Sequence, residues 1–506
     1  MPEAVNGRSV VPYQGIGAHV PQGSRAAPLI RSCAQYPANG DKRAPTLVEA
    51  FKRAGLRDGM TVSSHHHYRA GDLVAEQIFQ AAAELGVRNL VWFPSGVFPC
   101  HERLIPYLES GVIRRIESGP SGPLGDLASR GKMEGFTVVR SHGARYQALQ
   151  DGEVHLDLAV IAAPAADSFG NCSGALGPSA CGLLGFALGD SQYADHVIAA
   201  TDNLVEFPCV PWQIHGNSVD QVVVVDQVGD ASKIVSGTTE ITRDPGKLLI
   251  AEYAARFVRE AGIMRPGFSF QAGAGGISLA FTIFLADMMR DEGVKARFIR
   301  GGATKHLVKV LEEGLTDYIL DGQCFDLDAV RSLRDNPRHV ATSPYTSYNY
   351  HGKGNFASLL DCVVLGATEV DLEFNANCVT HSDGRLLHNL GGWQDSLFSR
   401  CTILTAPTHR KSTPIIRESV TTLCGPGELI DVVVTEKGVA INPRREDLLA
   451  ALSASSLPLR TLAELKEEAE SACGMREAPA ALKDDLFGVV AWVDGTIIDS
   501  LRVVDS

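Results

Sequence analysis

The segment His65–Asp72 concentrates side chains that can bind an anion. It holds three adjacent histidines (65–67) and Arg69, whose guanidinium can make two parallel hydrogen bonds to a carboxylate or phosphate. Histidines are also metal ligands, but consecutive loop residues seldom point at one ion, and no carboxylate follows at a zinc-protease spacing. We therefore expect no metal site and predict that His65, His66 and Arg69 bind an anionic substrate.

A second run of polar groups, Ser141-His142-Gly143-Ala144-Arg145, falls between an expected strand and a turn. His142 and Arg145 would add hydrogen-bond donors for the same anion if the fold brings the two segments together. The alternative is a solvated turn without a binding role, and the sequence leaves both open.

The segment Gln271–Gly276, QAGAGG, follows an expected strand and opens an expected helix. Backbone amides at such a helix N-terminus can bind a cofactor diphosphate or an oxyanion. The segment lacks the Lys-Ser/Thr ending of a P-loop and the full GxGxxG spacing, so a simple tight turn remains the alternative. We expect Gln271, Gly273, Gly275 and Gly276 to contact a cofactor.

The stretch Asp361–Asn377 begins as a buried strand and ends in a polar edge that contains Glu369. Ligands of α/β proteins collect at the carboxyl ends of such strands. Glu369 has three possible roles: a nucleophile that forms an acyl intermediate, a residue that orients a substrate group, or the ion-pair partner of a nearby lysine or arginine. Its position favours a site residue without choosing between the roles.

Alternating strands and helices must position these groups. The predicted elements are helix 47–54, strand 60–63, helix 73–85, strand 89–93, strand 268–270, helix 277–289 and strand 296–299. Strands that alternate with helices in this way predict parallel sheets with right-handed crossovers.

The layout occurs twice along the chain. Asp157, Asp167 and Asn171 stand 204 positions before Asp361, Asp371 and Asn375, and the turn glycines Gly59 and Gly111 return at similar offsets as Gly267 and Gly314. Glu369 breaks the repeat, because its counterpart is Ala165. Three features that repeat in the same order indicate a duplicated α/β domain, with the active site in a cleft between the copies.

The predicted organisation has four parts. Residues 1–45 form an arm without its own core, 46–240 the first α/β domain, 245–445 the second, and 446–506 a tail. The tail carries two short helices and a β-hairpin, in which 487–493 and 496–504 flank the turn Asp494-Gly495.

Bulk composition excludes several classes of protein. The net charge of −13 argues against a nucleic-acid partner, which needs clustered basic residues. Eleven scattered cysteines without a CxxC pair fit a reducing compartment rather than a disulfide framework or a zinc ribbon. The sequence shows no signal peptide and no apolar run long enough for a membrane helix, so we expect a cytoplasmic location.

These motifs together resemble the alpha subunit of citrate lyase, from about Thr46 to the terminal hairpin. The segments that carry the resemblance are Asp58–Asp72, Gly119–Gly125, Ser141–Arg145, Gly229–Ile234, Phe270–Gly276 and Asp361–Asn377, with Gly384 and Gly391-Gly392. A wider resemblance to CoA-transferases implies two tandem CoA-transferase-like domains, in agreement with the duplication.

The resemblance implies a citrate CoA-transferase that exchanges acetyl for citryl on an acyl carrier subunit and releases acetate. The thioester would be carried by phosphoribosyl-dephospho-CoA on the carrier (gamma) subunit, with acetyl-CoA able to take its place, and no cofactor would be bound covalently to this chain. A beta subunit would cleave citryl-ACP. The alpha chain would be a homo-oligomer within this complex in the bacterial cytoplasm.

Related CoA-transferases carry a glutamate nucleophile just after the strand that follows the glycine-loop helix. Here that place, Phe298–Thr304, holds no carboxylate. The resemblance then implies a ternary complex in which a citrate carboxylate attacks the acetyl thioester and forms a mixed anhydride. We expect Arg69, His142 and Arg145 to hold citrate, the amides of Gly275 and Gly276 to stabilise the oxyanion, and Glu369 to orient groups around the thioester.

Two alternatives stay open. The first is a related enzyme that acts on free CoA and short-chain acids. The absence of a glutamate from Phe298–Thr304 argues against it. A non-catalytic scaffold would only bind the carrier and lyase subunits.

Overall fold

The computed structural model describes residues 4–5, 8–20, 37, 39–235, 240–349, 354–474 and 480–505. Nearly half of the expected arm, residues 1–3, 6–7, 21–36 and 38, lies outside the described residues. Its described end reaches into the first sheet, because Arg43–Ala44 forms a strand there, so this sheet begins before Thr46. No helix of the described residues has the length and apolar character that crossing a membrane requires.

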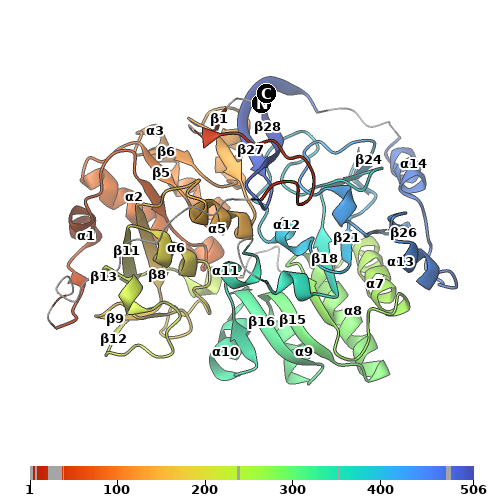
Figure 1. Ribbon diagram of the computed structural model, residues 1–506, viewed down its shortest axis with the longest axis horizontal. Helices are drawn as coiled ribbons and strands as arrows, with labels where there is room; N and C mark the ends of the chain where they lie inside the picture. The colour runs from red at the N-terminus through yellow and green to blue at the C-terminus, as the bar shows by residue number, and fades with distance from the viewer. Residues whose placement is uncertain are drawn as a thin grey trace.

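The N-terminal sheet has seven parallel strands in the order β3-β13-β11-β8-β4-β5-β6 (Figure 1). Their bounds are β3 Arg43–Ala44, β4 Thr61–Ser63, β5 Leu90–Trp92, β6 Ile113–Ile116, β8 Leu158–Ala163, β11 His196–Thr201 and β13 Gln221–Val224. The helices include α1 Leu47–Ala54, α2 Val74–Glu84, α4 Gly122–Ser129, α5 His142–Gln150 and α6 Ala187–Tyr193. Strand β8 is buried along its whole length, as expected for the centre of a parallel sheet.

The C-terminal sheet has eight strands in the order β17-β16-β15-β14-β18-β21-β25-β26, and only the edge strand β26 is antiparallel. Their bounds are β14 Ser269–Ala272, β15 Ala296–Ala303, β16 Thr316–Cys324, β17 His339–Ala341, β18 Cys362–Gly366, β21 Thr402–Thr405, β25 Val432–Thr435 and β26 Gly438–Ile441. The helices include α7 Pro245–Glu260, α8 Gly276–Glu292, α9 Lys305–Glu312, α10 Leu327–Asp335 and α12 Trp393–Ser396.

The two sheets repeat one topology. The order β6-β5-β4-β8-β11-β13 of the first sheet corresponds strand by strand to β16-β15-β14-β18-β21-β25 of the second. Each half also carries a small three-stranded sheet, β10-β9-β12 or β20-β19-β24. These strands are β9 Ala165–Asp167, β10 Cys172–Ser173, β12 Leu204–Val205, β19 Glu369–Asp371, β20 Ala376–Asn377 and β24 Ile416–Arg417.

The aspartates that revealed the repeat have matching structural roles. Asp167 accepts a hydrogen bond from the Asn171 side chain at 2.7 Å, and Asp371 accepts one from Asn375 at 3.2 Å. Each aspartate also caps the turn that follows, by accepting backbone amides two and four residues ahead. The repeat in the sequence therefore records two copies of the same turn.

The tail joins the two halves. Strand β27 (Leu482–Ala491) pairs with β28 (Ile497–Val504) and with β7 (Thr137–Val139) of the first half. The tail helices are α13 Glu446–Ala451 and α14 Leu462–Cys473. The predicted hairpin is present, and its first strand begins at Leu482, five residues earlier than predicted.

Candidate active site at the junction of the two halves

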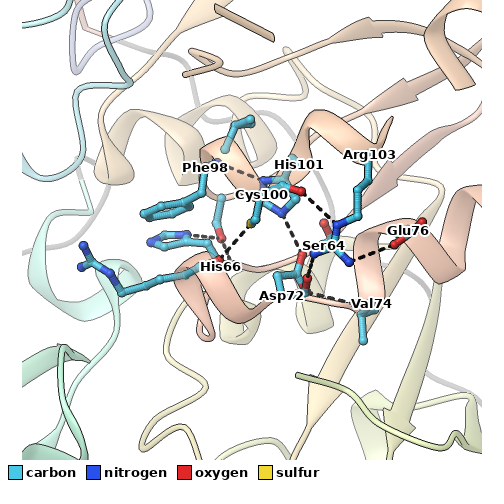
Figure 2. Close-up of polar contacts among 12 residues, drawn as sticks. Ser64, His66, Asp72, Val74, Glu76, Phe98, Cys100, His101 and Arg103 are labelled. Carbon is cyan, nitrogen blue, oxygen red and sulfur yellow. Dashed lines mark hydrogen bonds and ion pairs between the residues drawn. The ribbon is translucent and has the colours of Figure 1, made fainter. Parts of the chain in front are cut away.

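The histidine-rich loop after β4 is fixed by neighbouring segments of the first half (Figure 2). His66 Nδ1 lies 2.8 Å from Ser95 Oγ, and Asp72 Oδ2 lies 2.9 Å from His101 Nε2. Asp72 also accepts the Val74 amide at 3.1 Å, so it caps the first turn of α2. The loop is therefore a rigid platform at the carboxyl end of a central strand.

His65 and Arg145 share one buried carboxylate. Arg145 donates to both oxygens of Asp190, at 2.6 and 2.7 Å, and His65 Nε2 lies 2.9 Å from the same side chain. Burial alone would raise the pKa of Asp190, but the Arg145 guanidinium and the hydrogen bond with His65 hold it well below its usual value. The Arg145 guanidinium is thus already paired with a carboxylate, and direct substrate binding by His65 and Arg145 stays a prediction.

His142 and His66 face each other at the junction. Their rings stack at a centroid distance of 5.6 Å, and Phe186 contacts both. His142 is half-buried at the start of α5. Burial, with the nearby cations of Arg145 and Arg300, lowers the pKa of His142 to about 3, so the imidazole is neutral at pH 7.

Arg69 lies between two aromatic rings from opposite halves. Its guanidinium is 5.4 Å from the Phe98 ring centroid and 4.4 Å from that of Phe325. Its backbone has φ 53°, a conformation that non-glycine residues seldom adopt and that positions the side chain at the junction. Burial lowers the pKa of Arg69 to about 10, so it remains a cation at neutral pH.

Arg300 is a buried cation that no sequence motif marked as a site residue. It lies within β15, which extends to Ala303 instead of ending at Ile299 as predicted, because pairing with β16 continues past a bulge at Gly301/Gly302. It donates to Gln271 Oε1 at 2.7 Å and to the Tyr348 hydroxyl, whose ring it covers at 4.2 Å. Among the described residues no carboxylate lies within ion-pair distance of Arg300, although the side chain is only 1% exposed.

Asp395 connects the second half to the helix that carries His142. Its carboxylate accepts the Ser141 hydroxyl at 2.7 Å and the Gly143 amide at 3.1 Å. Burial raises the pKa of Asp395 to about 7, although these two hydrogen bonds and Arg300 oppose the shift. A Cβ on Gly143 would lie 2.5 Å from Asp395 Oδ1, so this close contact requires glycine.

The glycine loop lies between β14 and α8, as expected. Gln271 donates to Ser396 Oγ at 2.7 Å and holds Arg300 with its other end, whereas the Gly273 amide already donates to the Val364 carbonyl at 3.1 Å. Gly275 is the exposed N-cap residue of α8, and Gly276 is the first residue of that helix. The amides available to a ligand are therefore those after Gly273.

Glu369 belongs to a different cluster. It is fully buried in β19, forms an ion pair with Arg417, and accepts the Thr421 amide at 2.7 Å and the Asn377 side chain at 2.9 Å. All of these partners come from its own half of the chain. The geometry is that of the ion-pair alternative, and a role for Glu369 beside the thioester stays a prediction.

The junction thus combines the cations Arg69 and Arg300 with neutral imidazoles and aromatic rings at the carboxyl ends of equivalent strands. Such a site suits a multiply charged anion held against an apolar thioester arm. Two similar α/β halves with this arrangement define a CoA-transferase-type protein. Structures of a malonate decarboxylase alpha subunit from Acinetobacter baumannii (TM-score 0.62, 16% identity, 88% of this chain and 92% of that chain) and of a 4-hydroxybutyrate CoA-transferase from Porphyromonas gingivalis (0.53, 17%, 85% and 98%) share the fold.

Sequence comparison identifies the family within this class. The family described as citrate lyase, alpha subunit (CitF), matches residues 41–504, and the chain belongs to it. Citrate lyase alpha chains of Klebsiella pneumoniae and Escherichia coli are 41% and 39% identical to it, over 91% and 92% of this chain and 91% of each relative. The structure of a citrate lyase alpha subunit from Streptococcus mutans in complex with citrate has a TM-score of 0.92 at 37% identity, with 97% of this chain and 96% of that chain covered. The chain is thus a CoA-transferase-type enzyme subunit of citrate lyase.

Proposed function

We propose that this chain binds citrate at the junction of its halves and transfers the citryl group directly onto an acetyl thioester. The acetyl group resides on the acyl carrier (gamma) subunit, through phosphoribosyl-dephospho-CoA, and the beta subunit cleaves the citryl thioester that results. The proposed location is the bacterial cytoplasm, and the chain would be a homo-oligomer within the complex. No group bound covalently to this chain takes part.

The observation that carries this proposal is a buried cation, Arg300 of β15, in the segment Phe298–Thr304, where the resemblance to CoA-transferases implies a glutamate. The segment after it, Gly301-Gly302-Ala303, offers no carboxylate, while Arg300 is a buried guanidinium without a carboxylate partner among the described residues. A buried unpaired cation is costly unless an anion balances it. A citrate carboxylate bound to Arg300 would supply both the balancing charge and the nucleophile.

The proposed steps balance without an enzyme-bound intermediate. One citrate carboxylate attacks the acetyl carbonyl, the C–S bond breaks and the carrier thiolate leaves. The thiolate then attacks the citryl carbonyl of the mixed anhydride, and acetate departs with the bridging oxygen. Because one thioester replaces another, no nucleotide hydrolysis is needed.

The residues divide the work as follows. Arg300 and Arg69 hold carboxylates of citrate, and His142 and His66 donate or accept hydrogen bonds at its hydroxyl and remaining carboxylate. The amides at Gly275 and Gly276 face the thioester arm and its oxyanion. Asp190, His65 and Arg145 keep the histidine loop in place, and we leave Glu369 outside the reacting centre.

The direct test mixes the purified chain with citrate and acetyl-CoA or acetyl-dephospho-CoA and detects citryl thioester by mass. We expect a citryl product that requires citrate. Exchange with acetate or butyrate and none with citrate would instead favour the enzyme acting on free CoA and short-chain acids.

Arg69 tests the anion pocket separately. Replacing it with alanine should weaken citrate binding at least tenfold, because a charge-assisted hydrogen bond contributes about 1.5–3 kcal/mol. Lys52, which is exposed on α1, provides a control position for the loss of one positive charge. Unchanged citrate affinity in Arg69→Ala would remove this residue from the site.

A further inference from the structure

The internal repeat also exposes a difference between the two small sheets. Strand β12 of the sheet β10-β9-β12 corresponds to β24 of the sheet β20-β19-β24, since each pairs in parallel with the strand that carries the turn aspartate. Leu204 pairs with Ala166, and Ile416 pairs with Val370, which lies 204 positions after Ala166. The two surfaces can therefore be compared residue by residue.

The surface over β24 is covered by helix α14. This amphipathic helix buries Leu462, Leu465 and Ala469, and it packs against β24 and the neighbouring strand β23 (Thr413–Pro414). Ile416 is fully buried in the same apolar cluster as the two leucines. In Figure 1, α14 lies beside β24 at the upper right.

The equivalent strand β12 lies at the lower left of Figure 1, and the apolar side chains on and after it are exposed. Leu204, Phe207, Val210 and Trp212 are 36%, 63%, 57% and 41% exposed among the described residues. We call these four side chains the β12 patch. Surface apolar residues are common singly, but four large ones within nine positions, including Phe and Trp, are typical of a protein-binding surface.

A charge at the edge of the patch extends the correspondence. Glu418 follows β24 and pairs with Lys466 of α14 at 3.4 Å. Glu206 holds the same place after β12 and is exposed. In the second half, α14 covers β24 with its leucines and pairs its Lys466 with Glu418. The first half has the counterparts of β24 and Glu418, which are β12 and Glu206, and Leu204 of β12 and Glu206 are both exposed.

We propose that the β12 patch binds an amphipathic helix of another subunit, with small and leucine-type side chains on the patch and a lysine or arginine beside Glu206. The proposal rests on membership of a multi-subunit enzyme and is independent of the transfer chemistry. The partner helix would occupy the place that α14 occupies in the second half, and would bury the exposed Phe and Trp rings as the centre of an interface.

Photo-crosslinking in the assembled complex tests the proposal. p-Benzoylphenylalanine replaces Phe207 in the chain co-purified with its beta and gamma partners, and cross-linked peptides are identified by mass. We expect one dominant cross-link to a helical segment of another subunit, and none from the same probe at Tyr318, an aromatic residue 46% exposed on β16. Cross-links only to residues of the same chain, only to a second copy, or to no protein would overturn the proposal.

A charged substitution supplies the second readout. Val210→Asp should weaken assembly of the complex at least tenfold, whereas Leu327→Asp, at a side chain 50% exposed on α10, should not. The isolated Val210→Asp chain should keep its thermal midpoint and its transfer between acetyl-CoA and citrate. Normal assembly of the Val210→Asp variant would contradict the proposed interface. Absence of transfer activity in the wild-type chain would contradict only the proposed function.

Discussion

The Gln271 side chain accepts a hydrogen bond from Arg300 at 2.7 Å, so the residue before the glycine loop orients the buried cation of the neighbouring strand. These strands, β14 and β15, pair in parallel with Gln271 opposite Arg300. The position of Gln271 in the sequence, at the start of the glycine-rich segment, predicts a contact with the cofactor. Its side chain orients Arg300, the group that we propose binds citrate, and a contact between Gln271 and the cofactor stays a prediction.

Arg300→Gln tests the role of this cation. The variant should raise the citrate KM by about tenfold to a hundredfold, because one or two charge-assisted hydrogen bonds to a carboxylate are lost. Arg297→Gln, at an exposed position of the same strand, should have no effect. Steady-state kinetics at varied citrate separate the outcomes, and an unchanged KM in a folded Arg300→Gln variant would contradict the proposed site.

Asp395→Asn should reveal the raised pKa of this carboxyl through the pH dependence of stability. Folding shifts the pKa from 3.8 to about 7, so the folded protein binds the proton more tightly and ionisation destabilises it increasingly as pH rises between these values. The stability of the asparagine variant relative to wild type should therefore rise from pH 4 to 7, by up to about 4 kcal/mol, and level off above pH 7. Urea denaturation across this range measures the difference. A pH-independent difference would show that Asp395 ionises normally.

Gly275→Ala tests the amides at the start of α8. An added Cβ meets no atom within 4 Å, and the backbone φ of −75° suits alanine, so the fold should be retained. If the thioester arm lies against this loop, the methyl group should raise the KM for acetyl-CoA several-fold and leave the citrate KM unchanged. If the variant had wild-type KM values for both acetyl-CoA and citrate, the thioester arm would not lie against this loop.

Glu369→Gln separates a structural from a catalytic role. Removing the charge breaks the buried ion pair between Glu369 and Arg417, which should lower the free energy of unfolding by about 3 kcal/mol. The kcat per folded molecule should stay close to wild type. A large fall in kcat with an unchanged free energy of unfolding would instead indicate that Glu369 takes part in the reaction.

The duplication could be predicted because the turn that repeats is built from local side-chain contacts. Asp167 with Asn171, and Asp371 with Asn375, need only the residues within each turn, so their spacing survives in the sequence. The helices with clear caps were also predictable. For example, Thr46 accepts the Glu49 amide and Gly55 ends α1 in a left-handed conformation.

The site was harder to predict because its contacts join distant parts of the chain. Asp395 accepts a hydrogen bond from Ser141, which lies 254 positions away in the sequence. Neither sequence segment contains a feature that predicts this contact. Arg300 lies in Phe298–Thr304, the segment that lacks the glutamate expected of related CoA-transferases. An arginine at this place is the feature of the sequence that could have indicated an anion-binding residue. The sequence also could not show that Arg145 is already paired with Asp190.

The most direct test of the transfer mechanism follows oxygen from citrate in a single turnover. Enzyme in excess over acetyl thioester is mixed with citrate labelled with ¹⁸O in its carboxylates, and the released acetate is analysed by mass. Direct attack by citrate predicts one ¹⁸O in acetate on the first turnover, because the bridging oxygen of the anhydride leaves with it. Unlabelled acetate on the first turnover would show that an enzyme carboxylate attacked instead, and would contradict the account.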